Sequence, residues 1–393
     1  MQSALLKGRE KLIEAIDRDP WERPYRIVMD KLRPSAPSIT KSMETELLER
    51  TVSALFRQDQ EEATTAHTLP DSNYPPPVTM EELNGVVKRM AARNTAPGPD
   101  GIRGKALSLA LTVLHEELVE VINSCLREGK MPACWKKARL VLIPKPGKDR
   151  VSPACLLSEA GKILERILMV RITEHLKISG PDLHDHQYGF RQGRSTIDAI
   201  SRVVGLAEGA IGQGGVALAV SVDIVNTFNT LPWRAIRESL ERHKLSEYLV
   251  RIINDYLTGR SVEYKEKKGH TQREINRAVP QGSVLGTLLW NLGYDKVLRT
   301  VLPAGVHVTC YADDTLLVAC GRNWTRTTRI MEVALAALVQ SISGIRDSGP
   351  EDIGRVATWL AVEQASAISV GGGQRRSTDP SRAKDKILGS RAG

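Results

Sequence analysis

The stretch HVTCYADDTLLVAC, residues 307–320, places two adjacent aspartates, Asp313 and Asp314, between two short apolar runs. Both runs favour β-structure, so the segment predicts a β-hairpin with the aspartates at its tip. Asp is common in turns because its side chain hydrogen-bonds the local backbone, and that explanation suffices for an isolated Ala-Asp-Asp turn. The second carboxylate fits it less well, because adjacent like charges repel unless a cation lies between them.

A third carboxylate, Asp223, lies upstream at the end of the apolar run VALAVSVDIV. An acid there can simply cap the following helix, which Pro232 is suited to open because the first helical N–H needs no partner. If the run is a strand beside the hairpin, however, three carboxylates converge at one end of a sheet. Hard oxygen ligands suit Mg²⁺, and two Mg²⁺ ions promote phosphoryl transfer by activating a hydroxyl and stabilising the leaving oxygen. The chemistry would then be nucleotidyl transfer.

The stretch VPQGSVLG lies between these two carboxylate sites. Gly282 in it lets the backbone approach a ligand closely, and Ser283 is placed to cap a following helix. Taken alone, the stretch is explained equally well as an ordinary loop-to-helix junction.

Composition limits the classes of function. The chain has 393 residues, 41% of them hydrophobic, a net charge of +9 and a pI near 9.3, which suits a polyanion: nucleic acid first, an anionic membrane second. The five cysteines are scattered without metal-ligand spacing and are interpreted as reduced intracellular thiols. The strongly apolar stretches are shorter than the ~18–20 residues of a membrane span, and the N-terminus lacks a signal-peptide core. We therefore expect a protein that is neither secreted nor membrane-spanning.

Four segments follow from the pattern along the chain. Residues 1–66 predict amphipathic helices, and the Pro-rich link at 69–79 ends them. Helix and strand signals then alternate to about residue 340, which predicts an α+β or α/β domain. The tail 347–393 ends in a Gly-rich, basic stretch with almost no apolar face, so we expect it to be disordered.

The stretches SVDIVNTF, VPQGSVLG and CYADD, in this order, resemble the central palm motifs of reverse transcriptases. NTAPGPDGI, LVLIPKPGK and QYGFRQGRSTIDAI resemble those of non-LTR (LINE-type) retrotransposons, closest to arthropod elements that insert into ribosomal DNA. The similarity runs from about residue 10 to 345, and ordered motifs are far more specific together than any one of them.

The resemblance implies an α+β right-hand polymerase with fingers and palm, a missing or unrecognisable thumb, and an N-terminal helical extension. The corresponding segments are a helical and linker region at 1–78, an extension of the polymerase domain at 79–138, fingers at 139–214, a palm at 215–346 (reverse transcriptase domain about 130–346 overall) and a divergent tail at 347–393.

Carried over residue by residue, the resemblance makes Asp223, Asp313 and Asp314 the catalytic ligands of two Mg²⁺ ions, with Mn²⁺ as a substitute. The backbone oxygen of Ile224 completes one metal shell. Phe228 lies under the incoming sugar and rejects a ribose 2′-hydroxyl; a plain core phenylalanine is the alternative.

The remaining implied contacts are with substrates. Gln281 and Gly282 line the incoming nucleotide and template, while Arg139 and Lys145 neutralise the triphosphate, although Lys145 can equally be a solvated turn lysine. The implied template-phosphate contacts are Arg191 and Arg194, which are otherwise residues of a basic loop.

The sequence also departs from the family. GKDRVSPACLLSEAGK lacks an AYRPI-like stretch, which removes an arginine expected to bind triphosphate and shortens a fingers strand. Ala278 and Thr287 stand where relatives carry Gly and Pro. The similarity stops after residue 347, where relatives continue into a palm strand with an HKTE-like lysine. We interpret this abrupt end of the similarity as a frameshift or splicing artefact.

The resemblance therefore implies an RNA-directed DNA polymerase that uses an RNA template, a DNA primer and deoxynucleoside triphosphates, acts in the nucleus, and belongs to a polyprotein with an endonuclease domain. Two alternatives stay open. One is a catalytically impaired nucleic-acid-binding remnant of such an element. The other is a group II intron maturase, which shares the palm motifs but is disfavoured by the closer match of APGPDGI and GFRQGRSTIDAI to LINE-type elements.

Overall fold

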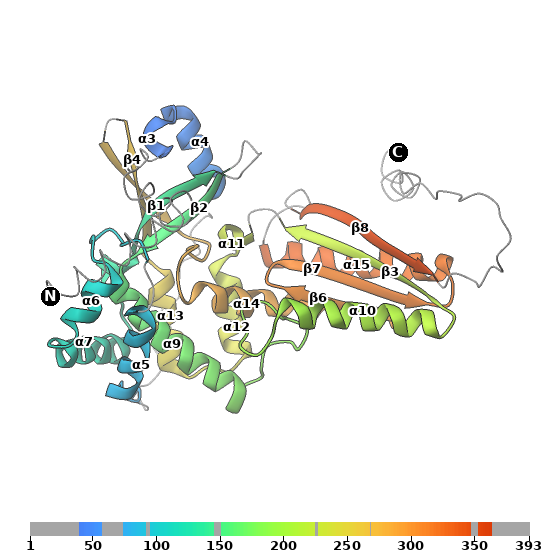
Figure 1. The fold of residues 1–393 in the computed structure, drawn as a ribbon, viewed down its shortest axis with the longest axis horizontal. Helices are drawn as coiled ribbons and strands as arrows, with labels where there is room; N and C mark the ends of the chain where they lie inside the picture. The colour runs from blue at the N-terminus through green and yellow to red at the C-terminus, as the bar shows by residue number, and fades with distance from the viewer. Residues whose placement is uncertain are drawn as a thin grey trace, which may run out of the picture.

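The computed structural model describes residues 39–56, 74–91, 95–144, 151–224, 227–267, 269–346 and 353–363. The described strands form two sheets, and each sheet is the centre of one lobe of an elongated molecule (Figure 1). Helices cover both sheets, which confirms the α+β class.

The first sheet has the strand order β2-β1-β4-β5. Its strands are β1 (Lys137–Pro144), β2 (Val151–Leu157), β4 (Arg260–Glu266) and β5 (Gly269–Ile275). Strand β1 pairs antiparallel with β2 and parallel with β4. Ala138, Leu140 and Leu142 alternate with more exposed residues along β1, so one face of the strand enters the core.

The hairpin of β1 and β2 is regular despite the missing AYRPI-like stretch. Every residue of β2 pairs with β1, from Ala138 opposite Leu157 to Pro144 opposite Val151. The shortened segment therefore still forms a complete edge strand, β2. The regular pairing does not supply another arginine for the triphosphate.

Helices surround the first sheet. They are α3 (Ile39–Ser42), α4 (Thr45–Leu55), α5 (Met80–Ala91), α6 (Gly104–Ala110), α7 (His115–Glu128), α8 (Ala133–Lys136), α9 (Glu159–Ile178) and α13 (Glu247–Leu257). Helix α9 contacts α5, α6 and α8, and most of its side chains are buried for that reason. The buried guanidinium of Arg171 on α9 donates to Glu82 and to the carbonyls of Pro76 and Pro77, which fixes the expected Pro-rich link against the core.

The second sheet has the order β6-β7-β3-β8. Its strands are β3 (Val216–Ile224), β6 (Val306–Tyr311), β7 (Asp314–Gly321) and β8 (Ile353–Glu363). Helix α10 (Thr196–Gly212) and helix α15 (Trp324–Arg346) pack on it. Cys320 donates to Leu206 O of α10, while a side chain at the next position, Gly321, would meet Thr327 of α15, so the two helices lie on opposite faces.

Between the lobes lie α11 (Thr227–Thr230), α12 (Trp233–Arg242) and α14 (Gly286–Leu298) (Figure 1). Trp233 donates its indole N–H to Ala278 O, which ties α12 to the segment that enters α14.

Two of the expected segment boundaries do not match the sheets. Residues 139–214 were assigned to the fingers, but α10 packs on the second sheet. Residues 215–346 were assigned to the palm, but β4 and β5 belong to the first sheet because β4 pairs with β1. A pairing between strands more than a hundred residues apart leaves no local signal in the sequence.

The expectation of disorder for the whole tail 347–393 is wrong for Ile353–Glu363. These residues form β8, which pairs antiparallel with β3. The segment IGRVATWLAVE is rich in β-favouring residues, and β3 offers it an unpaired edge. Residues 347–352 and 364–393 lie outside the described part of the chain.

One helix in the described residues, Trp324–Ile345 of α15, is long and apolar enough to cross a membrane by length and composition, and 28% of its most apolar part is buried. The expectation that the apolar stretches are too short therefore fails for this helix. Its buried residues, among them Ala334 and Leu338, pack against the second sheet and α14. A core helix passes the same test, so this is weak grounds for a membrane.

Candidate active site

The aspartates lie at the tip of a hairpin, as expected. Tyr311 at the end of β6 pairs with Asp314 at the start of β7, so Ala312 and Asp313 form a two-residue turn. Ala312 has a φ of 58°. The carboxylates of Asp313 and Asp314 therefore leave the same short turn at one end of the second sheet.

Asp223 reaches the same end of the sheet from β3. The pairing of Val222 with Thr315 places Asp223 beside Asp314 one position further along. Burial, then Asp313 and then Asp223 raise the pKa of the Asp314 carboxyl, so the three acids are close enough to repel one another. The strand arrangement supposed from the sequence is thus the one observed.

The chemistry of these donors fits a hard divalent cation. Within the described residues, none of the three carboxylates has a hydrogen bond or an ion pair of its own, so all are free to bind a ligand. In the same part of the chain, no group of three His, Cys, Asp or Glu side chains is already gathered around one metal position. The acids would have to turn toward a shared ion, which suits Mg²⁺ by donor type.

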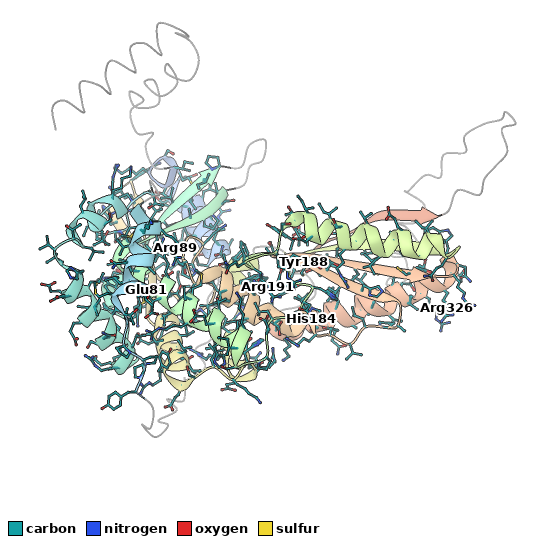
Figure 2. All side chains as sticks on the ribbon, turned by 60° about the horizontal axis from the view of Figure 1, so that its bottom comes forward. Glu81, Arg89, His184, Tyr188, Arg191 and Arg326 are labelled. Carbon is teal, nitrogen blue, oxygen red and sulfur yellow. The ribbon has the colours of Figure 1, made fainter. Side chains whose placement is uncertain are left out.

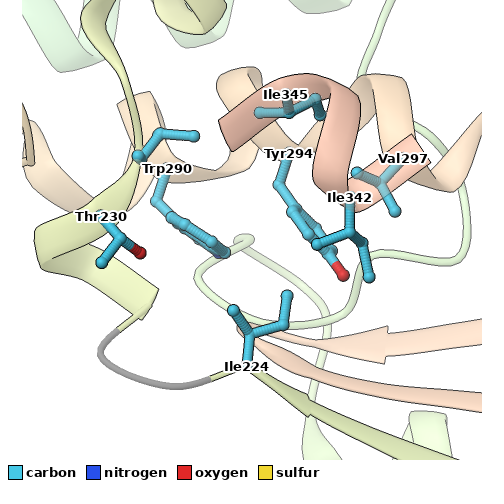
Figure 3. Close-up of a pocket in the computed structure, with 8 residues that line it drawn as sticks. Ile224, Thr230, Trp290, Tyr294, Val297, Ile342 and Ile345 are labelled. Carbon is cyan, nitrogen blue, oxygen red and sulfur yellow. The ribbon is translucent and has the colours of Figure 1, made fainter. Parts of the chain in front are cut away.

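Apolar packing supports the acidic end of β3. Ile224 borders a small apolar pocket (Figure 3). Asp223, the residue before it, is exposed. The pocket is also lined by Thr230, Leu231, Trp290, Tyr294, Val297, Ile342 and Ile345. Alternation along the strand thus separates an apolar side from the carboxylate side.

A buried polar chain lies beneath the hairpin. The Thr315 hydroxyl lies 2.8 Å from Tyr294 Oη and 2.9 Å from Cys310 Sγ. Burial raises the pKa of the Cys310 thiol to about 12, so it stays neutral. These contacts join both strands of the hairpin to α14.

The Gln281-Gly282 loop lies against β2. Cys155 N donates to Gln281 O, and Gly282 has a φ of 122° with Cys155 O only 2.4 Å from where a Cβ would be. No larger residue fits at Gly282 without moving backbone. The side chain of Gln281 is exposed, so it is free for the expected contact with nucleotide and template.

Glu165, which the sequence did not single out, holds the start of α14. Its carboxylate is 1% exposed and accepts from the Ser283 hydroxyl, Val284 N and Leu285 N. Ser283 in turn accepts from Gly286 N, which agrees with its expected capping role. The signal available in the sequence was an acid among the apolar positions of KILERIL.

Phe228 is half-buried in an aromatic cluster. Its ring lies 5.9 Å from Phe190 and 5.2 Å from Trp290, centre to centre. Val279 N donates to Phe228 O, which joins α11 to the segment before Gln281. The ring thus lies next to the expected site, and its role toward a sugar stays a prediction.

The expected cationic residues are largely engaged within the protein. Arg139 donates to Pro99 O and lies 3.7 Å from Glu263. Lys145 lies outside the described residues. These contacts leave the proposed triphosphate role of Arg139 a prediction and give it a second task, which is to hold the Gly/Pro-rich loop at 95–102.

Arg191 lies in the segment that joins the lobes, with Tyr188 and His184 nearby (Figure 2). Arg191 donates to Asp182 and to the carbonyls of Leu183 and His184, and its side chain is 13% exposed. Arg194 pairs with Asp185 at 3.4 Å and is 30% exposed, with its guanidinium 5.3 Å from the Tyr188 ring centre. Arg191 is therefore a structural anchor, whereas Arg194 is more accessible.

Residues 143–345 match the reverse transcriptase (RNA-dependent DNA polymerase) family, and the chain belongs to that family. Within it, the chain is a reverse transcriptase domain of the non-LTR retrotransposon kind. The Pol polyprotein of the type-1 retrotransposable element R1 of Bradysia coprophila is 28% identical over 77% of this chain and 31% of that protein. A putative 115 kDa protein in the element R1DM of Drosophila melanogaster is 30% identical over 78% of this chain and 30% of its own length.

The chain thus spans about a third of the length of these curated relatives. Among solved structures, apo telomerase from Candida tropicalis, truncated from the C-terminal domain, has a TM-score of 0.44 and 13% identity, covering 59% of this chain and 51% of that one.

Proposed function

We propose that the chain is an RNA-directed DNA polymerase that extends a DNA primer on an RNA template by nucleotidyl transfer with two Mg²⁺ ions. The observation that carries the proposal is the meeting of Asp223, Asp313 and Asp314 at one end of the second sheet, unpaired and mutually repulsive. When bound, the metal ions would activate the primer hydroxyl and stabilise the leaving pyrophosphate oxygen. Nuclear action and a parent polyprotein with an endonuclease domain belong to the same proposal.

The chain's own residues divide the work around that position. The three carboxylates and the Ile224 carbonyl hold the metal ions, and Mn²⁺ can replace Mg²⁺. Gln281 and Gly282 contact the nucleotide and template, which the exposure of Gln281 supports. Phe228 lies beneath the sugar and excludes a 2′-hydroxyl, which its place beside Phe190 and Trp290 supports.

A second candidate is a binding remnant that no longer turns over. The observation that favours it is the engagement of Arg139 with Pro99 and Glu263, combined with the missing AYRPI-like arginine. If Arg139 stays bound within the protein and the AYRPI-like arginine is missing, two positive charges are lost to the triphosphate. Triphosphate binding would then be weak even though the carboxylates are present.

Primer extension distinguishes the two. The purified chain is supplied with an oligo-dT primer on poly-rA, Mg²⁺ and dTTP, beside the double variant Asp313→Asn/Asp314→Asn. A matched control, Glu208→Gln/Glu332→Gln, removes two negative charges from exposed positions of the same lobe. Extension by the wild type and the control, lost in the Asp variant, supports the polymerase. A folded chain that binds the duplex in a gel-shift assay without extending it is the remnant.

A further inference from the structure

The turn at the tip of the hairpin has a backbone that its sequence does not favour. Ala312 has a φ of 58°, in the left-handed region. This conformation is unfavourable for a residue with a Cβ, and two-residue hairpin turns normally place Gly or Asn at such positions. Contacts from outside the turn must therefore hold Ala312 in place.

Gln187 makes those contacts. Its side chain is 1% exposed, and its amide pairs with both polar groups of one residue: Nε2 donates to Ala312 O at 3.1 Å, and Oε1 accepts from Ala312 N at 3.1 Å. Oε1 also accepts from Gly189 N at 3.0 Å. An amide carries a donor and an acceptor in one plane, so it can pair with the Ala312 backbone as a neighbouring strand would.

The segment that carries Gln187 is itself fixed to the hairpin. Tyr188 N donates to Cys310 O, and Cys310 N donates to His186 O, both at 2.8 Å. A Cβ at Gly189 would lie 2.0 Å from Ala312 N, so the two backbones touch where only glycine fits. From the other side, buried Asn291 of α14 donates to Gly189 O.

We propose that Gln187 is a positioning residue that sets the geometry of the Asp313-Asp314 turn and thereby the affinity and placement of the catalytic metal ions. Gln187 touches neither carboxylate. It fixes the Ala312 peptide, from which both acids follow in the chain, so it acts through the backbone. The metal-binding part of this inference rests on the proposed function.

The first test measures the turn itself. Gln187→Met keeps the length of the side chain and removes its three hydrogen bonds, and the exposed Gln272→Met is the matched control. We expect amide hydrogen exchange at Gly189 and Ala312 to become at least about 10-fold faster in Gln187→Met and to stay unchanged in the control, because an amide exchanges when its hydrogen bond opens. Gln187→Glu, which still accepts from both amides, should be intermediate.

The second test measures metal binding without substrate, by Mn²⁺ electron paramagnetic resonance. Loss of an outer partner of a metal site costs about 10–100-fold in affinity or activity, and we expect Gln187→Met to fall in this range. In primer extension the same variant should lose kcat while the KM for primer–template stays within about two-fold, because the missing contact orients ligands and does not bind the duplex.

A Gln187→Met chain that folds, with wild-type exchange at Ala312 and wild-type Mn²⁺ affinity, overturns the inference. If that variant does not fold, Gln187→Glu decides in the same way. If Asp223→Asn binds Mn²⁺ as tightly as the wild type does, the proposed function fails. The exchange measurement then still decides whether Gln187 holds the turn.

Discussion

The Asp314 carboxylate is repelled by its acidic neighbours before any metal binds. Burial, Asp313 and Asp223 raise the pKa of its carboxyl in the folded state. A raised acid pKa means that the folded state binds the proton more tightly than the unfolded state, so stability falls as pH rises from the unfolded pKa near 4 through the folded pKa. At neutral pH the ionised carboxylate therefore destabilises the metal-free fold.

We accordingly expect Asp314→Asn to raise the melting temperature of the metal-free protein at pH 7 by about 1–3 °C, a small effect because solvent screens the repulsion. Mg²⁺ should raise the melting temperature of the wild type and not that of the variant. Differential scanning calorimetry with EDTA or Mg²⁺ measures both. A lower melting temperature for metal-free Asp314→Asn would mean that the carboxylate has a stabilising partner.

Arg191 has a structural task beside the template contact that its motif predicts, and that contact stays a prediction. Because its guanidinium holds the loop at 182–184, we expect Arg191→Ala to lower the free energy of unfolding by about 2–3 kcal/mol, the range for charged hydrogen bonds lost from a mostly buried group. Urea unfolding measures it. Arg326→Ala, an exposed arginine on α15 (Figure 2), should change stability by less than about 0.5 kcal/mol. Equal effects of the two changes would contradict the anchoring role.

At the scale of elements, a buried carboxylate holds the start of α14. Glu165 on α9 accepts two backbone N–H groups and the Ser283 hydroxyl, so the Gln281-Gly282 loop is tied to a helix more than a hundred residues upstream. The carboxylate also lies at the positive end of the α14 dipole.

We expect Glu165→Gln to lower the free energy of unfolding by about 1–3 kcal/mol, because one oxygen, Oε2, accepts all three bonds and a neutral amide oxygen is a weaker acceptor than a carboxylate oxygen. Denaturant unfolding checks this, with Glu46→Gln as the control. Glu46 is 76% exposed and pairs with Arg50 on the surface of α4, where the change should cost less than about 0.5 kcal/mol. A Glu165→Gln protein as stable as wild type would show that the charge of the carboxylate adds nothing to these hydrogen bonds.

Other elements differ in how far the sequence predicted them. The β6-β7 hairpin was predicted because its apolar runs and turn lie within fifteen residues of one another. Strands β4 and β5 were assigned to the palm because nothing in their own residues encodes the pairing of β4 with β1. Gln187 opens the quoted stretch QYGFRQGRSTIDAI, but its contact with Ala312 was missed because a glutamine between histidine and tyrosine carries no signal of burial.

At the scale of the whole molecule, buried acids join distant parts of the chain. Burial alone would raise the pKa of Asp295, but hydrogen bonds from His243, Arg299 and His184 N outweigh it and lower that pKa. Glu82 behaves in the same way: burial opposes and the Arg171 contact prevails, so its pKa is lowered. A lowered acid pKa stabilises the fold above the unfolded pKa, and this stability is lost as pH falls through the folded pKa.

We therefore expect the free energy of unfolding to fall as the pH drops from about 5 to 3. The fall should be less steep in Asp295→Asn, because asparagine does not titrate and so loses no stability through protonation. Urea unfolding at a series of pH values measures both slopes. Glu208→Gln on α10, with an exposed side chain, is the control and should keep the wild-type slope. Parallel slopes for wild type and Asp295→Asn would show that Asp295 makes no net contribution.

The sequence by itself determined the family, the strand, helix and hairpin order of the motifs and the three carboxylates, because these depend on short stretches with their own periodicity and residue chemistry. Only the tertiary structure decided which lobe each segment joins, that Ile353–Glu363 completes the second sheet, and that Gln187 bonds the Ala312 turn and Glu165 the start of α14. Those features depend on contacts between residues far apart in the chain, whose pairing follows from packing and hydrogen-bond satisfaction in three dimensions and not from local pattern.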